Sequence, residues 1–289
     1  MLGIAHDEDC FFLSGDLGFM ALEDVRNAFG ARFVNAGVAE QNMVGVGAGL
    51  ARSGYRCFIY SIAPFCYARP YEQIRNDLCL GRLPVCLVGN GGGYAYGYMG
   101  PTHHALEDCA AMCALGVRVL VPAFDTDVAS LVGRIECPTY LRLGLDAGPL
   151  GRARPPWATW RRLLHGEAGA LVALGPLSGL AWATLLDAPE AKRPAVWAAC
   201  ELPLGEIPEA LWRDVADKPL HVIEEHVAAG GLGMQLALAM IATGVRPSRF
   251  EHRPALGYPG DRYGSQNFHR AQCGFDAAEI ATMTLRAGQ

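Results

Sequence analysis

The stretch that decides the fold is ARFVNAGVAEQNMVGVGAGLARSGYRCFIYSI, residues 31–62. It begins with a short run rich in β-branched and aromatic residues, continues with apolar side chains at helical spacing, and ends with a second β-rich run. A strand, a helix and another strand in this order predict a parallel sheet covered by helices.

The same alternation continues along the chain. The proline- and glycine-rich segment GPLGRARPPW, residues 148–157, interrupts it, since no helix or strand interior tolerates that composition. We therefore expect an α/β protein with two doubly wound domains, residues 1–150 and 157–289. The strand candidates are FFLSG, ARFVNAG, RCFIYS, LPVCLVG, VRVLVPA and PTYLRLG in the first domain and ALVALG, PAVWAACE and LHVIEE in the second.

Composition excludes several classes of protein. With 51% hydrophobic and 18% charged residues over 289 positions, the chain can bury a large core and is not disordered. A net charge of -5 without a basic cluster argues against nucleic acid as a partner. Ten cysteines without a CxxC pair predict buried thiols. The acidic start MLGIAHDEDC lacks the features of a secretory signal, so we expect a cytoplasmic protein without membrane contact.

Glu40 is unusual because it lies among small and apolar residues, followed by Gly45, Gly47 and Gly49. A glycine inside a helix costs roughly 1 kcal/mol relative to alanine, so we expect a close contact along this helix. Glu40 has two interpretations. It is an acid in the first turn, favoured by the helix dipole, or a buried acid whose raised pKa lets it exchange a proton with a ligand nitrogen.

A glycine-rich loop, GNGGGYAYGYMGPTHHALED at residues 89–108, holds the second candidate site. Its glycines do not form GxGxxG, so dinucleotide binding is weakly supported. We expect a helix capped by Thr102, with Glu107 and Asp108 in its first turn. His103 at its start is either an acid, base or donor to a substrate oxyanion, or a solvated histidine.

Other polar and aromatic residues have weaker patterns. Arg142, near the end of a strand, suits a phosphate or carboxylate, although an exposed structural arginine is equally consistent. His103, Cys109 and Cys113 are spread along one expected helix and do not converge, so we expect no metal site in this chain. Five aromatic residues either line a pocket or fill the core: Phe65, Tyr67, Tyr94, Tyr96 and Tyr98.

Four ordered segments resemble the C-terminal half of transketolases and of deoxyxylulose-phosphate synthases, with a pattern most similar to split transketolases. HVIEEHVAAGGLG at 221–233 also fits, so the resemblance covers essentially the whole chain, a pyrimidine-binding domain followed by a transketolase C-terminal domain. The four segments are GDLGFMALE at 15–23, FVNAGVAEQNMVGVGAGLA at 33–51, YSIAPFCYARPYEQIRND at 60–77 and GPTHHALEDCA at 100–110.

The resemblance implies thiamine diphosphate as the cofactor. The glutamate that matches Glu40 bonds to N1′ of the aminopyrimidine and promotes the imino tautomer, which strips the C2 proton of the thiazolium. Phe65 would lie against the aminopyrimidine, with Asp16 and Leu17 near the cofactor. Ile62 takes a cofactor-binding place where many relatives have phenylalanine.

The resemblance also implies substrate contacts. His103 would meet the substrate oxygens and Arg142 the far anionic end, and Tyr96 and Arg69 would bind substrate as well. Met99 and Gly91 stand where sugar-phosphate transketolases carry an aspartate and a histidine. These changes and the added tyrosines of the loop favour an acceptor that is bulkier or less hydroxylated than an aldose phosphate.

The diphosphate site of the family uses GDG and a distant asparagine to hold a divalent metal, whereas this chain has only GDLG at 15–18. We therefore expect a separate subunit that carries the diphosphate-binding domain and holds Mg²⁺ or Ca²⁺, with two copies of each chain. The predicted activity is transfer of a two-carbon ketol unit, or a related acyl unit, between carbonyl substrates. The alternatives are a 2-oxo acid dehydrogenase beta-type subunit, disfavoured by GPTHH, and a non-catalytic pseudo-subunit.

Overall fold

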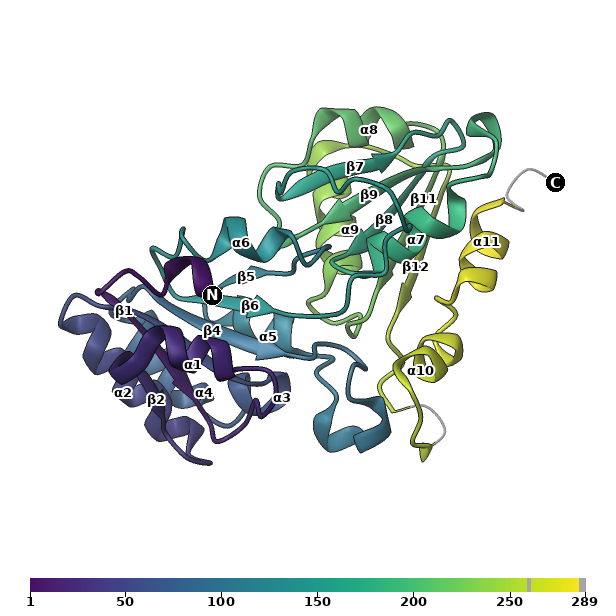
Figure 1. Cartoon of the computed structure of the whole chain (residues 1–289). Coiled ribbons are helices and arrows are strands. Elements are labelled where there is room, and N and C mark those ends of the chain that lie inside the picture. The colour runs from purple at the N-terminus through teal and green to yellow at the C-terminus, as the bar shows by residue number, and fades with distance from the viewer. Residues whose placement is uncertain (259–260, 286–289) are drawn as a thin grey trace.

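The computed structural model describes residues 1–258 and 261–285. Two sheets covered by helices lie side by side, and the chain passes from the first to the second through an extended segment (Figure 1). Residues 143–159 of that segment form no helix or strand. The linker was expected within this range, and the domain boundaries at 150 and 157 stay a prediction.

The first sheet has seven strands, six of them parallel. The exception is the edge strand β10, which comes from later in the chain and runs antiparallel to β5. Four of the five residues of β1 and five of the six of β4 are buried, as expected for strands covered on both faces. In sheet order the strands are β10 (Glu201–Leu202), β5 (Arg118–Leu120), β6 (Thr139–Arg142), β4 (Val85–Asn90), β3 (Arg56–Ile62), β1 (Cys10–Ser14) and β2 (Phe33–Asn35).

The second sheet has five strands. Four are parallel, and β7 pairs antiparallel with β9 at one edge. Its two strands β8 and β9 are buried along their whole length. In order the strands are β12 (Arg249–Pro254), β11 (Pro219–Glu224), β8 (Ala170–Leu174), β9 (Ala195–Ala199) and β7 (Trp160–Leu164).

Helices cover both sheets, with α2 against β3 in the first domain and α9 against β11 in the second. The α-helices are α1 (Glu23–Phe29), α2 (Glu40–Arg52), α3 (Ala63–Tyr67), α4 (Tyr71–Gln73), α5 (Asp108–Ala114), α6 (Asp127–Leu131), α7 (Leu177–Leu185), α8 (Glu209–Val215), α9 (Leu232–Thr243), α10 (Gln266–Gln272) and α11 (Ala277–Leu285). Shorter helical turns span Leu2–Ile4, Gly30–Arg32, Ile74–Cys79, Gly97–Met99, Pro101–His103 and Glu190–Lys192. Within the described ranges, every helix is too short or too polar to span a bilayer.

The predicted α/β fold is confirmed. Each of the nine strand candidates contains a strand, but the edge strands β7, β10 and β12 were not predicted. β12 carries four charged or imidazole side chains in RFEHRP, and β10 has only two residues, so neither has the apolar run that marks a buried strand. All ten cysteines are free thiols.

Two local predictions were wrong. The helix expected to begin near Thr102 begins at Asp108, because Pro101–His103 forms a separate helical turn. The close contact expected along α2 exists only at Gly47, where a Cβ would lie 2.7 Å from Cδ1 of Ile59. A Cβ at Gly45 or Gly49 would meet open space.

Candidate functional site

Glu40 is the first residue of α2, and its side chain is only 3% exposed. Arg69 donates from Nη1 to both carboxylate oxygens, at 2.9 Å each. Ser61, on β3, donates to Oε1 from 3.4 Å. Both interpretations of Glu40 therefore describe part of what the structure shows: the acid begins the helix, and it is also buried with polar partners.

Phe65 on α3 lies between two basic side chains. The guanidinium carbon of Arg69 is 4.0 Å from the centre of the Phe65 ring, a cation–π distance. On another side, the His103 ring meets the Phe65 ring edge to face, with centroids 5.1 Å apart. Because β3 feeds directly into α3, the fold brings Glu40, Phe65 and His103 from three segments into one site.

His103 and Tyr96 come from the glycine-rich loop that follows β4. Nδ1 of His103 lies 3.0 Å from the hydroxyl of Thr102, and its ring is 6.4 Å from that of Tyr96. Asn90, at the end of β4, donates to the Tyr96 hydroxyl at 2.7 Å. Burial raises the pKa of Tyr96, so its hydroxyl stays protonated at neutral pH. Ile62 pairs in register with Asn90, which puts it at the same sheet edge.

Asp16 and Leu17 form a tight turn after β1. Asp16 is exposed and has a positive φ of 55°, and its Oδ1 accepts a hydrogen bond from Asn35 at 2.8 Å. The Leu17 carbonyl accepts a hydrogen bond from Ser14. The turn borders a cavity of about 60 Å³. It lies close to the catalytic candidate, because a Cβ on Gly15 would be 3.8 Å from Oε1 of Glu40.

Arg142 is buried between the domains, with its side chain 5% exposed. Its Nε donates to Asp108 at 2.7 Å, and its Nη2 donates to the carbonyls of Ala105 and Glu225. Glu225, on the second domain, thereby contacts an arginine of the first. This packing favours a structural role for Arg142, and its contact with the anionic end of a substrate stays a prediction.

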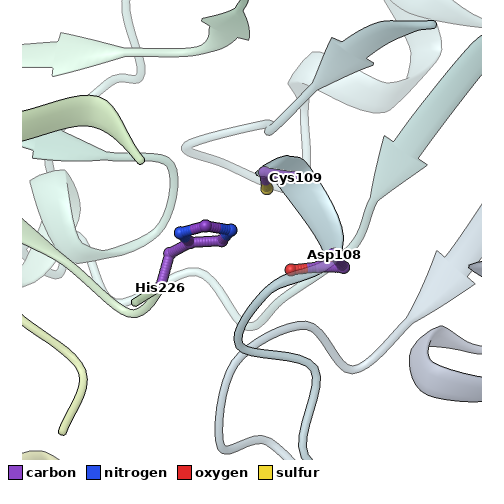
Figure 2. Close-up of side chains that lie close together, drawn as sticks. All are labelled: Asp108, Cys109 and His226. Atoms are coloured by element: carbon purple, nitrogen blue, oxygen red, sulfur yellow. The ribbon is translucent and has the colours of Figure 1, made fainter. Parts of the chain in front are cut away.

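Asp108, Cys109 and His226 lie together at the start of α5, with one potential ligand atom of each within 4.8 Å of the others (Figure 2). Asp108 already accepts from Arg142 and from Tyr140. Nε2 of His226 accepts from the backbone of Ala110, and Nδ1 lies 2.7 Å from the carbonyl of Val227. Burial holds the pKa of the Cys109 thiol well above its usual range. Because the carboxylate and the imidazole are already hydrogen-bonded and the thiol keeps its proton, we assign no metal to them.

Sequence reasoning missed the contacts that fix the glycine-rich loop to the second domain. Glu225 accepts hydrogen bonds from the backbone of Tyr94 and from the side chains of Gln266 and Arg270. His104 is buried in the same region, and burial lowers its pKa below the usual value. Only the doubled acid in HVIEEH hinted at such a contact, because acids that follow directly on an apolar strand are seldom buried unless they are paired.

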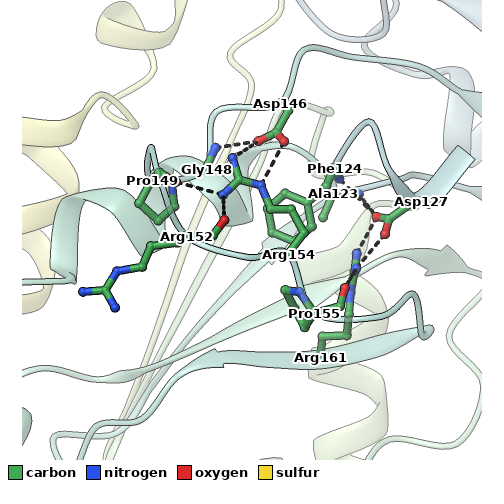
Figure 3. A network of polar contacts seen from close by, with 10 residues as sticks. All are labelled: Ala123, Phe124, Asp127, Asp146, Gly148, Pro149, Arg152, Arg154, Pro155 and Arg161. Atoms are coloured by element: carbon green, nitrogen blue, oxygen red, sulfur yellow. Dashed lines mark hydrogen bonds and ion pairs between the residues drawn. The ribbon is translucent and has the colours of Figure 1, made fainter.

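A second polar network joins the domains on the other side of the chain crossing (Figure 3). Arg161 on β7 forms a two-bond ion pair with Asp127 on α6, with distances of 2.7 and 2.6 Å. Asp127 also accepts from the backbone of Ala123 and Phe124. Both charged side chains are almost fully buried, so the two domains are held by paired charges in the interior.

This geometry agrees with the comparisons to known proteins. Residues 4–143 match the family described as the transketolase pyrimidine-binding domain. The chain belongs to the transketolase family. Its resemblance to the C-terminal subunit of split transketolase-like enzymes is confirmed.

Two transketolase relatives are named as one of the subunits of an apulose-4-phosphate transketolase. The protein from Phocaeicola vulgatus is 36% identical over 148 residues, which cover 50% of this chain and 47% of that one. The protein from Actinobacillus succinogenes is 29% identical over 276 residues, which cover 89% of this chain and 85% of that one. The alignment thus spans about half of the first relative and most of the second.

Among solved structures, a split gene transketolase described as an inactive beta4 tetramer superposes on the transketolase chain with a TM-score of 0.81. The two are 26% identical, and the match covers 99% of this chain and 94% of the other. Both domains therefore have counterparts in one solved transketolase chain.

Proposed function

We propose that this chain is the pyrimidine-binding subunit of a split enzyme that uses thiamine diphosphate to transfer a two-carbon ketol unit between carbonyl substrates. The observation that carries the proposal is the buried Glu40 carboxylate beside the Phe65 ring, with His103 on another side of that ring. An acid, a flat apolar surface and an acid–base group in this order suit a planar heterocycle and a substrate beyond it.

The residues fit the aminopyrimidine of that cofactor on an observation made within this chain. Glu40 and Phe65 already accept a planar N–H donor, the Arg69 guanidinium, which bonds to the carboxylate and lies over the ring. When bound, the cofactor supplies the stabilised carbanion chemistry of the reaction. Glu40 would hold and exchange a proton at the pyrimidine nitrogen, and Phe65 would orient the ring.

His103 would donate to the substrate oxygen on which negative charge develops, or take up its proton. Its bond to Thr102 and its contact with Phe65 hold the ring over the site. Tyr96, Arg69 and Ile62 would border the substrate side, while Asp16 and Leu17 would lie near the cofactor from the end of β1.

A diphosphate-binding partner would complete the site and hold the divalent metal, Mg²⁺ or Ca²⁺. The names of the relatives, in which the matching chain is one subunit of the enzyme, support such a partner. We propose two copies of each chain and a cytoplasmic location. The same names support a ketose phosphate as the first donor to assay.

The experiment is to co-express the chain with its partner and to measure thiamine diphosphate-dependent ketol transfer with wild-type Glu40 and Glu40→Gln. We expect the variant to lose activity by roughly 10²- to 10⁴-fold, because proton transfer at the pyrimidine nitrogen would be removed. Glu72→Gln is the control, since Glu72 is an exposed acid on the nearby α4.

Full activity in Glu40→Gln would contradict the assigned proton transfer. Absence of thiamine diphosphate binding by the wild-type complex would contradict the whole proposal and favour the non-catalytic subunit. Release of CO₂ from a 2-oxo acid with acyl transfer to a lipoyl group would instead identify the dehydrogenase-type alternative.

A further inference from the structure

Arg69 lies where the aminopyrimidine of the proposed cofactor must lie. Its guanidinium bonds to both oxygens of Glu40 at 2.9 Å, and its central carbon is 4.0 Å above the Phe65 ring. The carboxylate and the ring face are the two surfaces that the proposed function assigns to the pyrimidine. One planar group occupies both, so the arginine side chain and the cofactor ring cannot be there together.

The guanidinium has the chemical features of the group it would exclude. It is planar, it presents N–H donors to a carboxylate in its own plane, and it stacks on an aromatic face. A lysine ammonium has neither the plane nor the paired donors. The match therefore belongs to the shape of arginine and is not only a matter of positive charge.

The position of Arg69 allows it to leave. It lies in the turn between α3 (Ala63–Tyr67) and α4 (Tyr71–Gln73), and its side chain is 44% exposed, whereas that of Glu40 is 3% exposed. A rotation of the side chain toward solvent frees Glu40 and Phe65 without any movement of the sheet. The Arg69 backbone stays fixed, because its carbonyl accepts a hydrogen bond from Gln41 on α2.

We propose that Arg69 is a placeholder for the aminopyrimidine: it neutralises and orients Glu40 in the free chain and is displaced when the cofactor binds. This inference rests on the proposed function. It makes Arg69 a positioning residue that acts through Glu40. Without Arg69, a buried carboxylate would keep only the long contact from Ser61, and burying an unpaired charge is costly.

The first test uses the full-length chain alone. Arg69→Ala is expected to lower the melting temperature, and millimolar guanidinium chloride is expected to restore part of the loss by binding between Glu40 and Phe65. Arg75→Ala is the matched control, since Arg75 is exposed and its guanidinium bonds only to the adjacent Asn76. Guanidinium is expected to leave this control unstabilised. A lack of stabilisation in Arg69→Ala would overturn the proposal.

The second test measures thiamine diphosphate binding to the assembled complex by calorimetry. Arg69→Ala and the longer Arg69→Met are both expected to bind roughly threefold to tenfold tighter than wild type, because no ion pair or cation–π contact has to be broken. Guanidinium should weaken binding in Arg69→Ala but not in wild type. Arg69→Lys should bind between the two, since its ammonium pairs without stacking.

Unchanged or weaker binding in both Arg69→Ala and Arg69→Met would overturn the placeholder and favour direct contact of Arg69 with cofactor or substrate. Failure of the wild-type complex to bind thiamine diphosphate at all would overturn the proposed function instead. The guanidinium test on the free chain does not depend on the partner, so the two failures are distinguishable.

Discussion

Asp127 and Arg161 show how single residues stabilise the junction between the domains. Their side chains are 1% and 4% exposed, and two hydrogen bonds of 2.7 and 2.6 Å join them. Removing one partner of a buried pair leaves the other charge without compensation in a region of low dielectric constant. The pair therefore matters less for its attraction than for the cost of breaking it.

We expect Asp127→Ala to lower the free energy of unfolding by about 3 to 5 kcal/mol, because Arg161 would stay buried and unpaired. Arg162→Ala is the control on the same strand, since its contacts with Asp214 are 3.4 Å long and partly exposed. A change below about 1 kcal/mol is expected there. Equal effects of the two variants in urea denaturation would contradict the importance of burial.

At the scale of one element, α2 combines a functional first residue with an interior rich in glycine. Glu40 begins the helix, and Gly45, Gly47 and Gly49 weaken it. Only Gly47 faces β3 closely, where it makes room for Ile59. A Cβ on either of the other two glycines would meet open space, so the packing of this chain does not explain them.

Gly49→Ala is expected to stabilise the chain by about 0.4 to 1 kcal/mol, because alanine favours the helix and its methyl group meets open space. Gly47→Ala should give no such gain, since its Cβ would lie 2.7 Å from Ile59. Thermal unfolding of the two variants tests the contrast. A larger gain at Gly47 than at Gly49 would show that the contact with β3 is loose.

The central elements were predictable because their signal is local. Strands such as β4 are continuous apolar runs, and the βαβ alternation sets their order of appearance. The edge strands were not, since β12 is charged and β10 is defined only by its neighbour β5. The candidate residues came from chemistry and resemblance, but the pairing of Arg69 with Glu40 depends on two segments meeting in space, which no spacing along the chain reveals.

At the scale of the whole molecule, apolar side chains stand in solvent beside the proposed cofactor site. Phe19 and Met20, which follow the Asp16–Leu17 turn, are 81% and 97% exposed. Val38, just before α2, is also exposed. Large apolar side chains next to a functional site suit burial by another subunit.

We expect Phe19→Ser combined with Met20→Ser to weaken assembly with the diphosphate-binding partner by at least about tenfold, because two apolar contacts would be lost from the interface. The paired change Leu238→Ser and Ile241→Ser, at exposed positions on α9, is the control and should leave assembly unchanged. Sedimentation measures both. Equal dissociation constants for wild type and the Phe19/Met20 variant would place the interface elsewhere.

The antiparallel strand β10 has a consequence for how such chains can evolve. Glu201 and Leu202 follow β9 of the second domain, yet they finish the sheet of the first, and Glu201 forms two 2.8 Å bonds with Arg118. A recombination event between residues 150 and 157 would strip the first domain of its border strand and leave the backbone of β5 open to association with other chains. The two halves are therefore inherited as one unit, and exchange of modules in this lineage has to occur outside their shared border.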